Sequence, residues 1–276
     1  MNNELNKVND DGFKILTALA ILAGLFKIIG GVIYSSKAVT VDAATSIGNI
    51  LAIGIVNRYY KLSKLPPDKD HHYGHIRLAF GGDVYTLMIY SFVAGLLTID
   101  LIQGLSARYQ VSFYASIYSA IGTVLYAIVI FLSIRIGRIL ELYSRVSVIE
   151  LIEGLTATSA ALAGAFISYL IDLVGGFGLY LYLIIELLRS SRKLIIEISD
   201  RSSDRVLREI IDIAEKYEVV VKSVKVREVY ADHFYSDIVI GVPPDLSVRE
   251  AHDIIDKIER RLREKNIVAI IHIEPV

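Results

Sequence analysis

The chain has 276 residues, of which 54% are hydrophobic and 21% are charged, and it contains no cysteine. The formal net charge of −1 gives no overall attraction to nucleic acid or anionic lipid, so no nucleic-acid partner is expected. The lack of cysteine excludes disulfides, thiolate metal sites and cysteine nucleophiles, and a soluble domain is seldom so apolar.

Six apolar stretches are each long enough to cross a bilayer as a helix, which takes about 20 residues. They lie near residues 13–34, 39–61, 80–104, 112–136, 146–170 and 173–189. The first is not expected to be a signal peptide, because its apolar part is too long and no clear cleavage site ends it. We therefore predict an α-helical membrane protein with six transmembrane helices.

The orientation of the spans follows from the lysine and arginine residues near their ends. These residues gather after the second, fourth and sixth spans, as in the group Arg135, Arg138 and Arg145. The opposite side carries only Lys37 and Arg108. The sequence thus predicts a multi-pass protein of the cell membrane with both its N- and C-termini in the cytoplasm.

Two of the spans carry polar residues on one helical face. In the second span they stand at steps of three and four: Asp42, Thr45, Ser46 and Asn49. The fifth span carries two carboxylates one turn apart, Glu150 and Glu153. A charged side chain in the bilayer costs at least about 2.5–3.5 kcal/mol, which makes each a candidate functional residue. Carboxylates brought together from the two faces would form an oxygen-rich site for a hard cation.

Two plainer interpretations stay open for these charged residues. Glu150 and Glu153 lie near the predicted cytoplasmic end of their span, where water could solvate them. Lys27 of the first span could instead pair with Asp42 as a buried ion pair whose role is structural.

The loop between the second and third spans, PPDKDHHYGHIRL, holds three of the six histidines. It offers a possible nitrogen and oxygen ligand set: Asp68, His71 and His75. Because the two histidines stand four residues apart, one helical turn would aim both rings the same way. Asp70 could substitute for Asp68, and His72 is expected to be exposed. The alternative is a solvated loop with incidental histidines.

After Asp200 the composition becomes that of a soluble domain. The pattern predicts a helix, two strands, a helix and a strand at residues 203–217, 219–229, 234–242, 247–265 and 267–273. Ser203 and Ser247 are expected helix N-caps, with Glu250 completing a capping box. This α-β-β-α-β order predicts a small ferredoxin-like or metallochaperone-like α+β layer with both helices on one face of the sheet. We expect two domains, transmembrane 1–200 and cytoplasmic 201–276, and dimerisation to enlarge the modest core of the second.

Several motifs together resemble the cation diffusion facilitator family. They are the loop pattern P-x-D-x-x-H-x-Y-G-H-x-R, VDAATS at 41–46, SVREAHDIIDKIERRL and IIHIEP, with Asp172 and Asp200 at fitting positions. The resemblance covers nearly the whole chain. It implies a six-span homodimer that exports divalent transition metals by proton antiport and carries a cytoplasmic domain of this α-β-β-α-β order.

The resemblance also implies a transport site with two ligands from span two and two from span five, each pair four residues apart. The chain departs from that pattern, because it offers Asp42 with Ser46, and Glu150 with Gly154, while Glu153 stands one residue out of phase. The implied ligands are Asp42, Ser46, Glu150 and Glu153. The cation could be zinc, manganese, iron, cobalt or cadmium. No span contains histidine, so an oxygen-rich site favours manganese, iron(II), cobalt or magnesium over zinc.

Two further metal sites are implied by the resemblance. Asp68, His71 and His75 match a second cation site in the loop. In the soluble domain, metal is expected near the dimer interface at His252 and His272, with Asp237 and Glu274 as companions. His233 matches no such position.

We therefore expect an exporter that alternates access to a divalent cation and lets protons compete for the same carboxylates. Two alternatives stay open. One is a degenerate family member that binds or senses metal without moving it, and the other is a membrane scaffold in which Lys27 neutralises Asp42. An enzyme is not expected, since we find no nucleophile–base spacing, glycine-rich phosphate loop or hydrolase motif.

Overall fold

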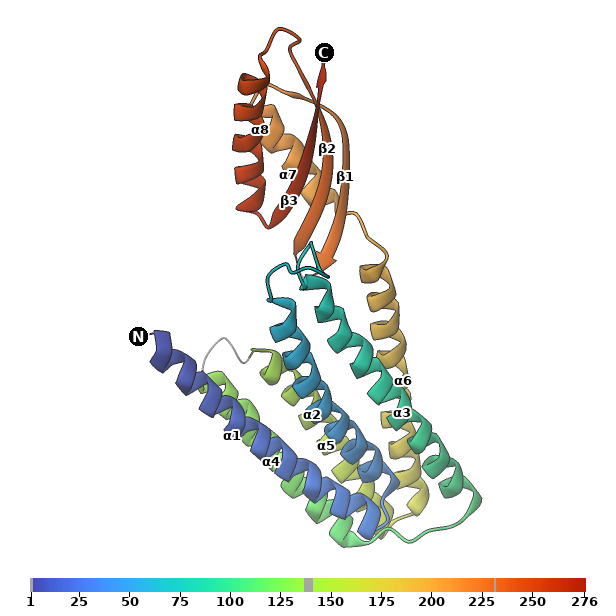
Figure 1. Ribbon diagram of the computed structural model, residues 1–276. Coiled ribbons are helices and arrows are strands. Elements are labelled where there is room, and N and C mark those ends of the chain that lie inside the picture. Colours follow the sequence, from blue (N-terminus) through green and yellow to red (C-terminus); the bar gives the residue numbers. More distant parts are fainter. Residues whose placement is uncertain (1, 137–140, 231) are drawn as a thin grey trace. The chain divides into compact units, whose positions relative to one another are not determined.

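The computed structural model describes the backbone of residues 2–136, 141–230 and 232–276, and the side chains of 14–132, 148–230 and 232–276 (Figure 1). Six long helices occupy the predicted spans: α1 (Asn2–Ile28), α2 (Lys37–Ser63), α3 (Ala79–Ser106), α4 (Phe113–Ile136), α5 (Glu141–Phe166) and α6 (Tyr169–Ile198). Each contains a segment long and apolar enough to cross a membrane. The prediction of a six-helix membrane protein is confirmed.

The ends of two spans were predicted wrongly. The break between the fifth and sixth spans falls between Phe166 and Tyr169, not at residues 171–172. Ser168 causes the earlier start, because its hydroxyl oxygen accepts a hydrogen bond from the Leu170 amide at 3.3 Å. Helix α6 also continues nine residues past the predicted end at 189, to Ile198, since apolar residues such as the buried Leu194 recur there at helical spacing.

The chain forms two compact units, and each is described by itself. One unit contains residues 1–57 and 84–190, and the other contains residues 58–83 and 191–276. The predicted domain limits, 1–200 and 201–276, stay a prediction. The residues Arg135, Arg138 and Arg145, on which part of the predicted orientation rests, lie outside the described side chains.

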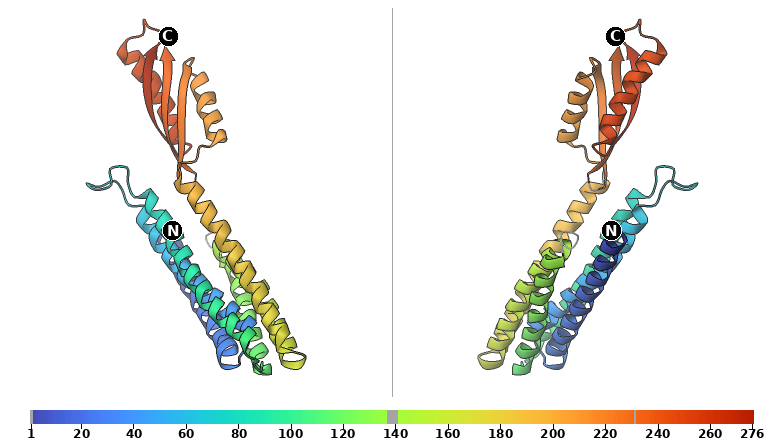
Figure 2. Two further views of the ribbon diagram at one scale, coloured as in Figure 1. Left: turned by 90° about the vertical axis from the view of Figure 1, so that its right-hand side faces the viewer. Right: turned by 90° about the vertical axis from the view of Figure 1, so that its left-hand side faces the viewer.

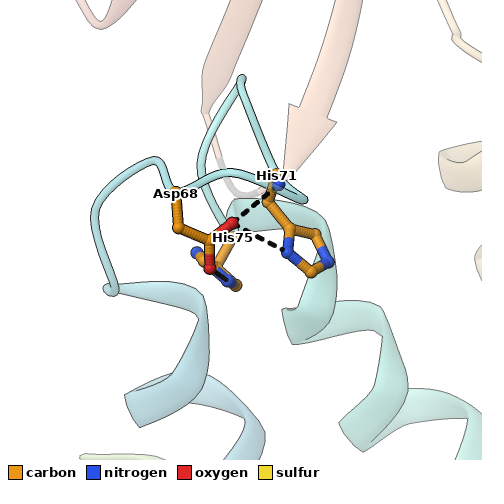
Figure 3. Close-up of side chains that lie close together, drawn as sticks. All are labelled: Asp68, His71 and His75. Atoms are coloured by element: carbon orange, nitrogen blue, oxygen red, sulfur yellow. Dashed lines mark hydrogen bonds and ion pairs between the residues drawn. The ribbon is translucent and has the colours of Figure 1, made fainter.

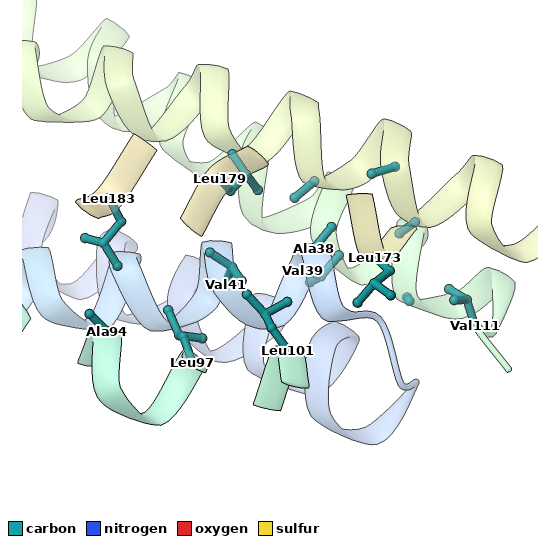
Figure 4. Packing of buried hydrophobic residues seen from close by; sticks show 14 residues of the cluster. Ala38, Val39, Val41, Ala94, Leu97, Leu101, Val111, Leu173, Leu179 and Leu183 are labelled. Atoms are coloured by element: carbon teal, nitrogen blue, oxygen red, sulfur yellow. The ribbon is translucent and has the colours of Figure 1, made fainter. Parts of the chain in front are cut away.

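The first unit packs its helices through small residues and leucines (Figure 4). Ala38 and Val41 of α2 lie in one buried cluster with Leu101 of α3 and Ala161 of α5, and α1 runs alongside α4 (Figure 1). Small side chains let helices approach closely, which drives packing where lipid removes the hydrophobic effect. The outward faces stay apolar, so this unit fits a lipid surrounding.

A buried carboxylate fixes the start of α2. Asp172 in the first turn of α6 accepts hydrogen bonds from the Lys37 amide at 2.7 Å and the Ser36 hydroxyl at 2.5 Å. The hydroxyl of Tyr109 donates to the same carboxylate at 2.9 Å. An anionic acceptor at a helix N-terminus satisfies amides that have no partner within the helix. Asp172 therefore ties the start of α6 to the start of α2.

The second unit contains the predicted α-β-β-α-β domain (Figure 2). Its elements are α7 (Asp204–Glu215), β1 (Val220–Tyr230), β2 (His233–Val242), α8 (Val248–Arg263) and β3 (Ile267–Pro275). Strand β2 is central, antiparallel to β1 and parallel to β3. Both helices bury their apolar stripes against one face of the sheet, in a core that includes Ile210, Ile238 and Ile258. The predicted order and the single covered face are confirmed.

The two predicted N-caps of this domain are confirmed. The Ser203 hydroxyl oxygen accepts a hydrogen bond from the Val206 amide, and Ser247 with Glu250 forms a complete capping box. The Glu250 carboxylate accepts hydrogen bonds from the Ser247 hydroxyl at 2.6 Å and the Ser247 amide at 2.9 Å. These bonds hold the pKa of Glu250 below its usual value.

Ser247→Ala should lower the stability of α8 by about 1 kcal/mol, the usual loss for a serine N-cap. The folded pKa of Glu250 is depressed, so its contribution is complete above the unfolded pKa of about 4.3 and is lost as the pH falls through the folded value. Hydrogen exchange of the α8 amides in the intact chain measures the effect. Equal protection of the α8 amides in wild type and Ser247→Ala at pH 7 would contradict the prediction. Ser202→Ala, outside the capping box, is the matched control.

Candidate metal sites

Three carboxylates meet inside the helical unit, and we call Asp42, Glu150 and Glu153 the carboxylate cluster. Asp42 comes from α2 and the two glutamates come from α5. One oxygen of each lies within 4.8 Å of the others, and all three residues are buried. The Ser46 hydroxyl lies 2.5 Å from the Glu150 carboxylate. The four residues predicted for the transport site are thus brought together.

Lys27 of α1 reaches into this cluster. Its ammonium nitrogen lies 2.7 Å from Asp42 Oδ1, 3.2 Å from Glu150 Oε2 and 3.1 Å from Ser46 Oγ. An ammonium has three donors, and here each finds one of these oxygens. The Lys27–Asp42 ion pair, left open by the sequence, is present, and it includes Glu150 as well.

The helical register explains why Glu153 replaces the expected ligand at position 154. Glycine at 154 lies against Thr123 of α4, whose side chain a Cβ at that position would meet. Glu153 points instead toward α2, where the Thr45 hydroxyl donates to its Oε2 at 3.2 Å. Glu150 and Glu153 therefore share one face of α5, and the one-residue offset in the sequence does not separate them.

Two residues outside the cluster orient it. Asn49 donates from its side-chain amide to Glu150 Oε1, and the Tyr90 hydroxyl donates to the Asn49 carbonyl oxygen. Tyr90 lies on α3 and was not predicted, since a tyrosine in an apolar span carries no distinguishing signal. Among the residues that the structure describes, no hydrogen-bond donor reaches Asp42 Oδ2, although this atom is buried. A buried carboxylate oxygen normally has a partner, so this one is a potential cation ligand.

A cavity of about 200 Å³ lies against the cluster. Side chains of α2, α3, α5 and α6 line it, among them Thr45, Asn49, Tyr90, Glu153, Glu186 and Ser190. Glu153 is the member of the carboxylate cluster that faces the cavity. The lining is mostly apolar, with leucine and isoleucine side chains between the polar ones, and it continues along α6 to Ser190 at the end of this unit.

The loop residues also come together, in the second unit (Figure 3). Asp68 Oδ1 lies 3.3 Å from His71 Nδ1, and Asp68 Oδ2 lies 3.2 Å from His75 Nε2. The Asp68 carboxylate also accepts the His71 amide at 2.7 Å, and this bond is the main reason that the pKa of Asp68 lies below its usual value. Asp68 thus stays charged at mildly acidic pH.

The His75 ring lies between two oxygen atoms that both act as hydrogen-bond acceptors. Its Nδ1 lies 3.0 Å from the Pro66 carbonyl oxygen, which can only accept, so Nδ1 carries the proton in the neutral ring. Nε2 then presents a lone pair toward Asp68 Oδ2, which is another acceptor. Either a second proton or a metal ion between these two atoms makes the contact favourable.

The loop does not form the helical turn that the four-residue spacing of its two histidines would allow. No helix forms between Asp68 and His75. Instead, the carbonyl of His71 accepts the Gly74 amide at 2.9 Å, and Gly74 has a φ of +80°, which glycine adopts without strain. This turn brings the two histidine rings to a centroid distance of 4.3 Å. His72 is exposed as predicted, and Asp68 rather than Asp70 faces the rings.

The residues predicted to bind metal in the soluble domain do not come together within one chain. His252 lies on the exposed side of α8, 3.7 Å from Asp256. His272 and Asp237 lie on the sheet face that the helices leave open, and Glu274 pairs with Lys222 at 3.0 Å. Their role as metal ligands stays a prediction.

Comparison with known proteins covers both parts of the chain. A family model for the cation efflux transmembrane domain matches residues 14–198, and one for the cytoplasmic domain of cation efflux proteins matches residues 203–276. The manganese efflux system protein MneS of Bacillus subtilis is 22% identical over 99% of this chain and 98% of its own. MneP of the same organism is 22% identical over 95% of this chain and 93% of its own. An uncharacterized transporter of Methanocaldococcus jannaschii is 42% identical over 59 residues, 21% of this chain and 20% of its own.

His75→Ala in the loop should remove one metal-binding event per chain. The expected loss follows from the loss of the only ring whose Nε2 faces Asp68 Oδ2 among the described residues. Calorimetric titration of the full-length protein with Zn²⁺ or Mn²⁺ measures it, and His72→Ala is the matched control. An unchanged stoichiometry in His75→Ala would refute the loop site.

Proposed function

The chain belongs to the cation efflux family, also called the cation diffusion facilitator family, and we propose that it exports a divalent metal cation from the cytoplasm. The observation that carries this proposal is the meeting of three buried carboxylates from two membrane-spanning helices. Burying carboxylates in a membrane protein is costly. The Lys27 ammonium can compensate one of the three negative charges, so their convergence is best explained by a further cation that they bind.

Manganese is the cation that the site favours. The carboxylate cluster and Ser46 offer only oxygen ligands, which suit manganese better than zinc. The two relatives that match over more than nine-tenths of their lengths are both named for manganese efflux. Iron(II) and cobalt are the competing substrates to test.

The cavity supports a route from the cytoplasmic side. A cation entering past Glu186 and Ser190 would meet Glu153 first, and then Asp42 and Glu150. At the other ends of the spans, Lys37 pairs with Asp100 at 2.5 Å and Asp172 holds the start of α2. A second cavity lies there, and among the described residues none that line it belongs to the carboxylate cluster. These features fit a state of the protein that faces the cytoplasm.

Proton antiport and alternating access complete the proposal. Protons that arrive from outside compete with the metal for the same carboxylates, so their binding favours its release. The cytoplasmic domain would pair two copies of the chain, as the open face of its sheet and its modest core allow. The loop site Asp68, His71 and His75 would hold a second cation that stays with the protein.

Glu153→Gln should strongly reduce transport without unfolding the protein. Glu153 makes no bond to Lys27 and accepts one hydroxyl hydrogen bond, which an amide oxygen can also accept. Removing one of three carboxylates should lower Mn²⁺ flux into proteoliposomes by roughly tenfold or more, the equivalent of about 1.4 kcal/mol. Glu264→Gln, an exposed glutamate after α8, is the matched control. Wild-type flux in Glu153→Gln, or none in wild type, would contradict the proposal.

A second candidate function is favoured by the Lys27–Asp42 contact, namely a membrane scaffold or non-transporting metal binder. Asp42→Asn distinguishes the two. It leaves Lys27 incompletely paired and should cost about 3–5 kcal/mol of stability in either case. Under the export proposal, the variant should also bind Mn²⁺ more weakly than wild type in a His75→Ala background. A destabilised variant with unchanged Mn²⁺ affinity would favour the scaffold.

A further inference from the structure

We infer that Lys27 is a tethered cation that competes with the exported metal for the carboxylate cluster and thereby sets the affinity and the charge selectivity of the site. The inference rests on the proposed export function. It gives a role to the one cationic side chain among the described residues that contacts the cluster, which the family motif does not include.

Lys27 uses the same oxygens that a metal would need. Its ammonium contacts Asp42 Oδ1, Glu150 Oε2 and Ser46 Oγ at 2.7–3.2 Å. A divalent ion bound to these atoms would stand within a few ångströms of the ammonium, where cation–cation repulsion is strong in a buried site. The metal and the ammonium are therefore alternative occupants.

The position of Lys27 is built by α4 as well as by the carboxylates. A Cβ at Gly122 would come within 2.8 Å of Lys27 Cγ, so the missing side chain there makes room for the lysine stem. The Tyr126 ring centroid lies 4.6 Å from Lys27 Nζ. An aromatic face attracts a cation, so Tyr126 offers the ammonium a contact that does not use the carboxylate oxygens. The flexible four-carbon stem lets the ammonium exchange between these contacts.

The charges leave the site able to prefer a divalent ion. Three carboxylates face one ammonium, and Asp42 Oδ2 has no donor among the described residues. A divalent ion offers twice the charge of the ammonium that it displaces. Na⁺ and K⁺ offer no more charge, and they must also compete with a cation that is held in place by the chain. When the metal leaves, the returning ammonium compensates carboxylates that would otherwise be buried without a counter-ion.

The test compares Lys27→Met, which removes the charge at similar length, with Lys27→Arg, which keeps it. Mn²⁺ affinity is measured by calorimetry on the full-length protein, and the event at the cluster is the one that a Glu153→Gln change removes. Lys27→Met should bind Mn²⁺ roughly tenfold more tightly or better, and excess K⁺ should weaken that binding. Lys27→Arg should bind no more tightly than wild type.

Equal affinity in wild type and Lys27→Met would overturn the inference and leave the export proposal standing. If none of these proteins binds Mn²⁺ at the carboxylate cluster, the export proposal is overturned, and the inference is overturned with it. If Lys27→Met does not fold, the structure of wild type soaked with Mn²⁺ decides. Anomalous scattering should then locate Mn²⁺ at the cluster, with Lys27 Nζ beyond hydrogen-bond distance of Asp42 and Glu150. Mn²⁺ there with those contacts intact would refute the competition.

Discussion

The contact of Lys27 with Asp42 and Glu150 is the constraint on which the helical unit depends. Carboxylates in a membrane interior need a counter-charge, and one ammonium supplies part of it by bonding to two helices at once. This links α1 to α2 and α5 at a fixed depth. The compensation is incomplete, because three carboxylates face one lysine. A site with residual negative charge and a movable cation suits reversible metal binding better than it suits a purely structural ion pair.

Small residues make this arrangement possible. Glycine at 122 admits the stem of Lys27, and glycine at 154 lets α5 lie against Thr123 of α4. A methyl group at either place would push the helices apart and would move Glu150 relative to Asp42. In lipid, packing rather than the hydrophobic effect holds helices together. The close packing at these glycines therefore helps to set the positions of the charged side chains, together with the ion pairs between them. The geometry of the carboxylate cluster thus depends on α1, α2, α4 and α5, although its carboxylates come from α2 and α5 alone.

The sequence predicted the elements better than their contacts. Apolar length identified the six spans, and periodicity identified the α-β-β-α-β domain, because both signals are local. Helical spacing placed Asp42 and Ser46 on one face of the second span, and the family resemblance implied that this face meets Glu150. The involvement of Tyr90 and the added Glu150–Lys27 bond did not follow, since they depend on how helices are rotated against one another. The backbone of the histidine loop could not be predicted for a related reason. A four-residue spacing of histidines is compatible with several backbone conformations, and Gly74 allows a turn here.

The two candidate metal sites of the chain, the loop and the carboxylate cluster, differ in the ligands that they offer. The loop offers imidazole nitrogens with a carboxylate, and His75 is held in one tautomer by the Pro66 carbonyl, a preorganised arrangement that strengthens metal binding. The carboxylate cluster offers oxygen alone and contains its own competitor in Lys27. A transported ion must leave as readily as it enters. Weak binding in competition with Lys27 is therefore an advantage at the carboxylate cluster. A resident ion must stay. Under the proposed function, the carboxylate cluster would exchange its cation and the loop would retain one, and Lys27 would supply the competition that favours release from the cluster.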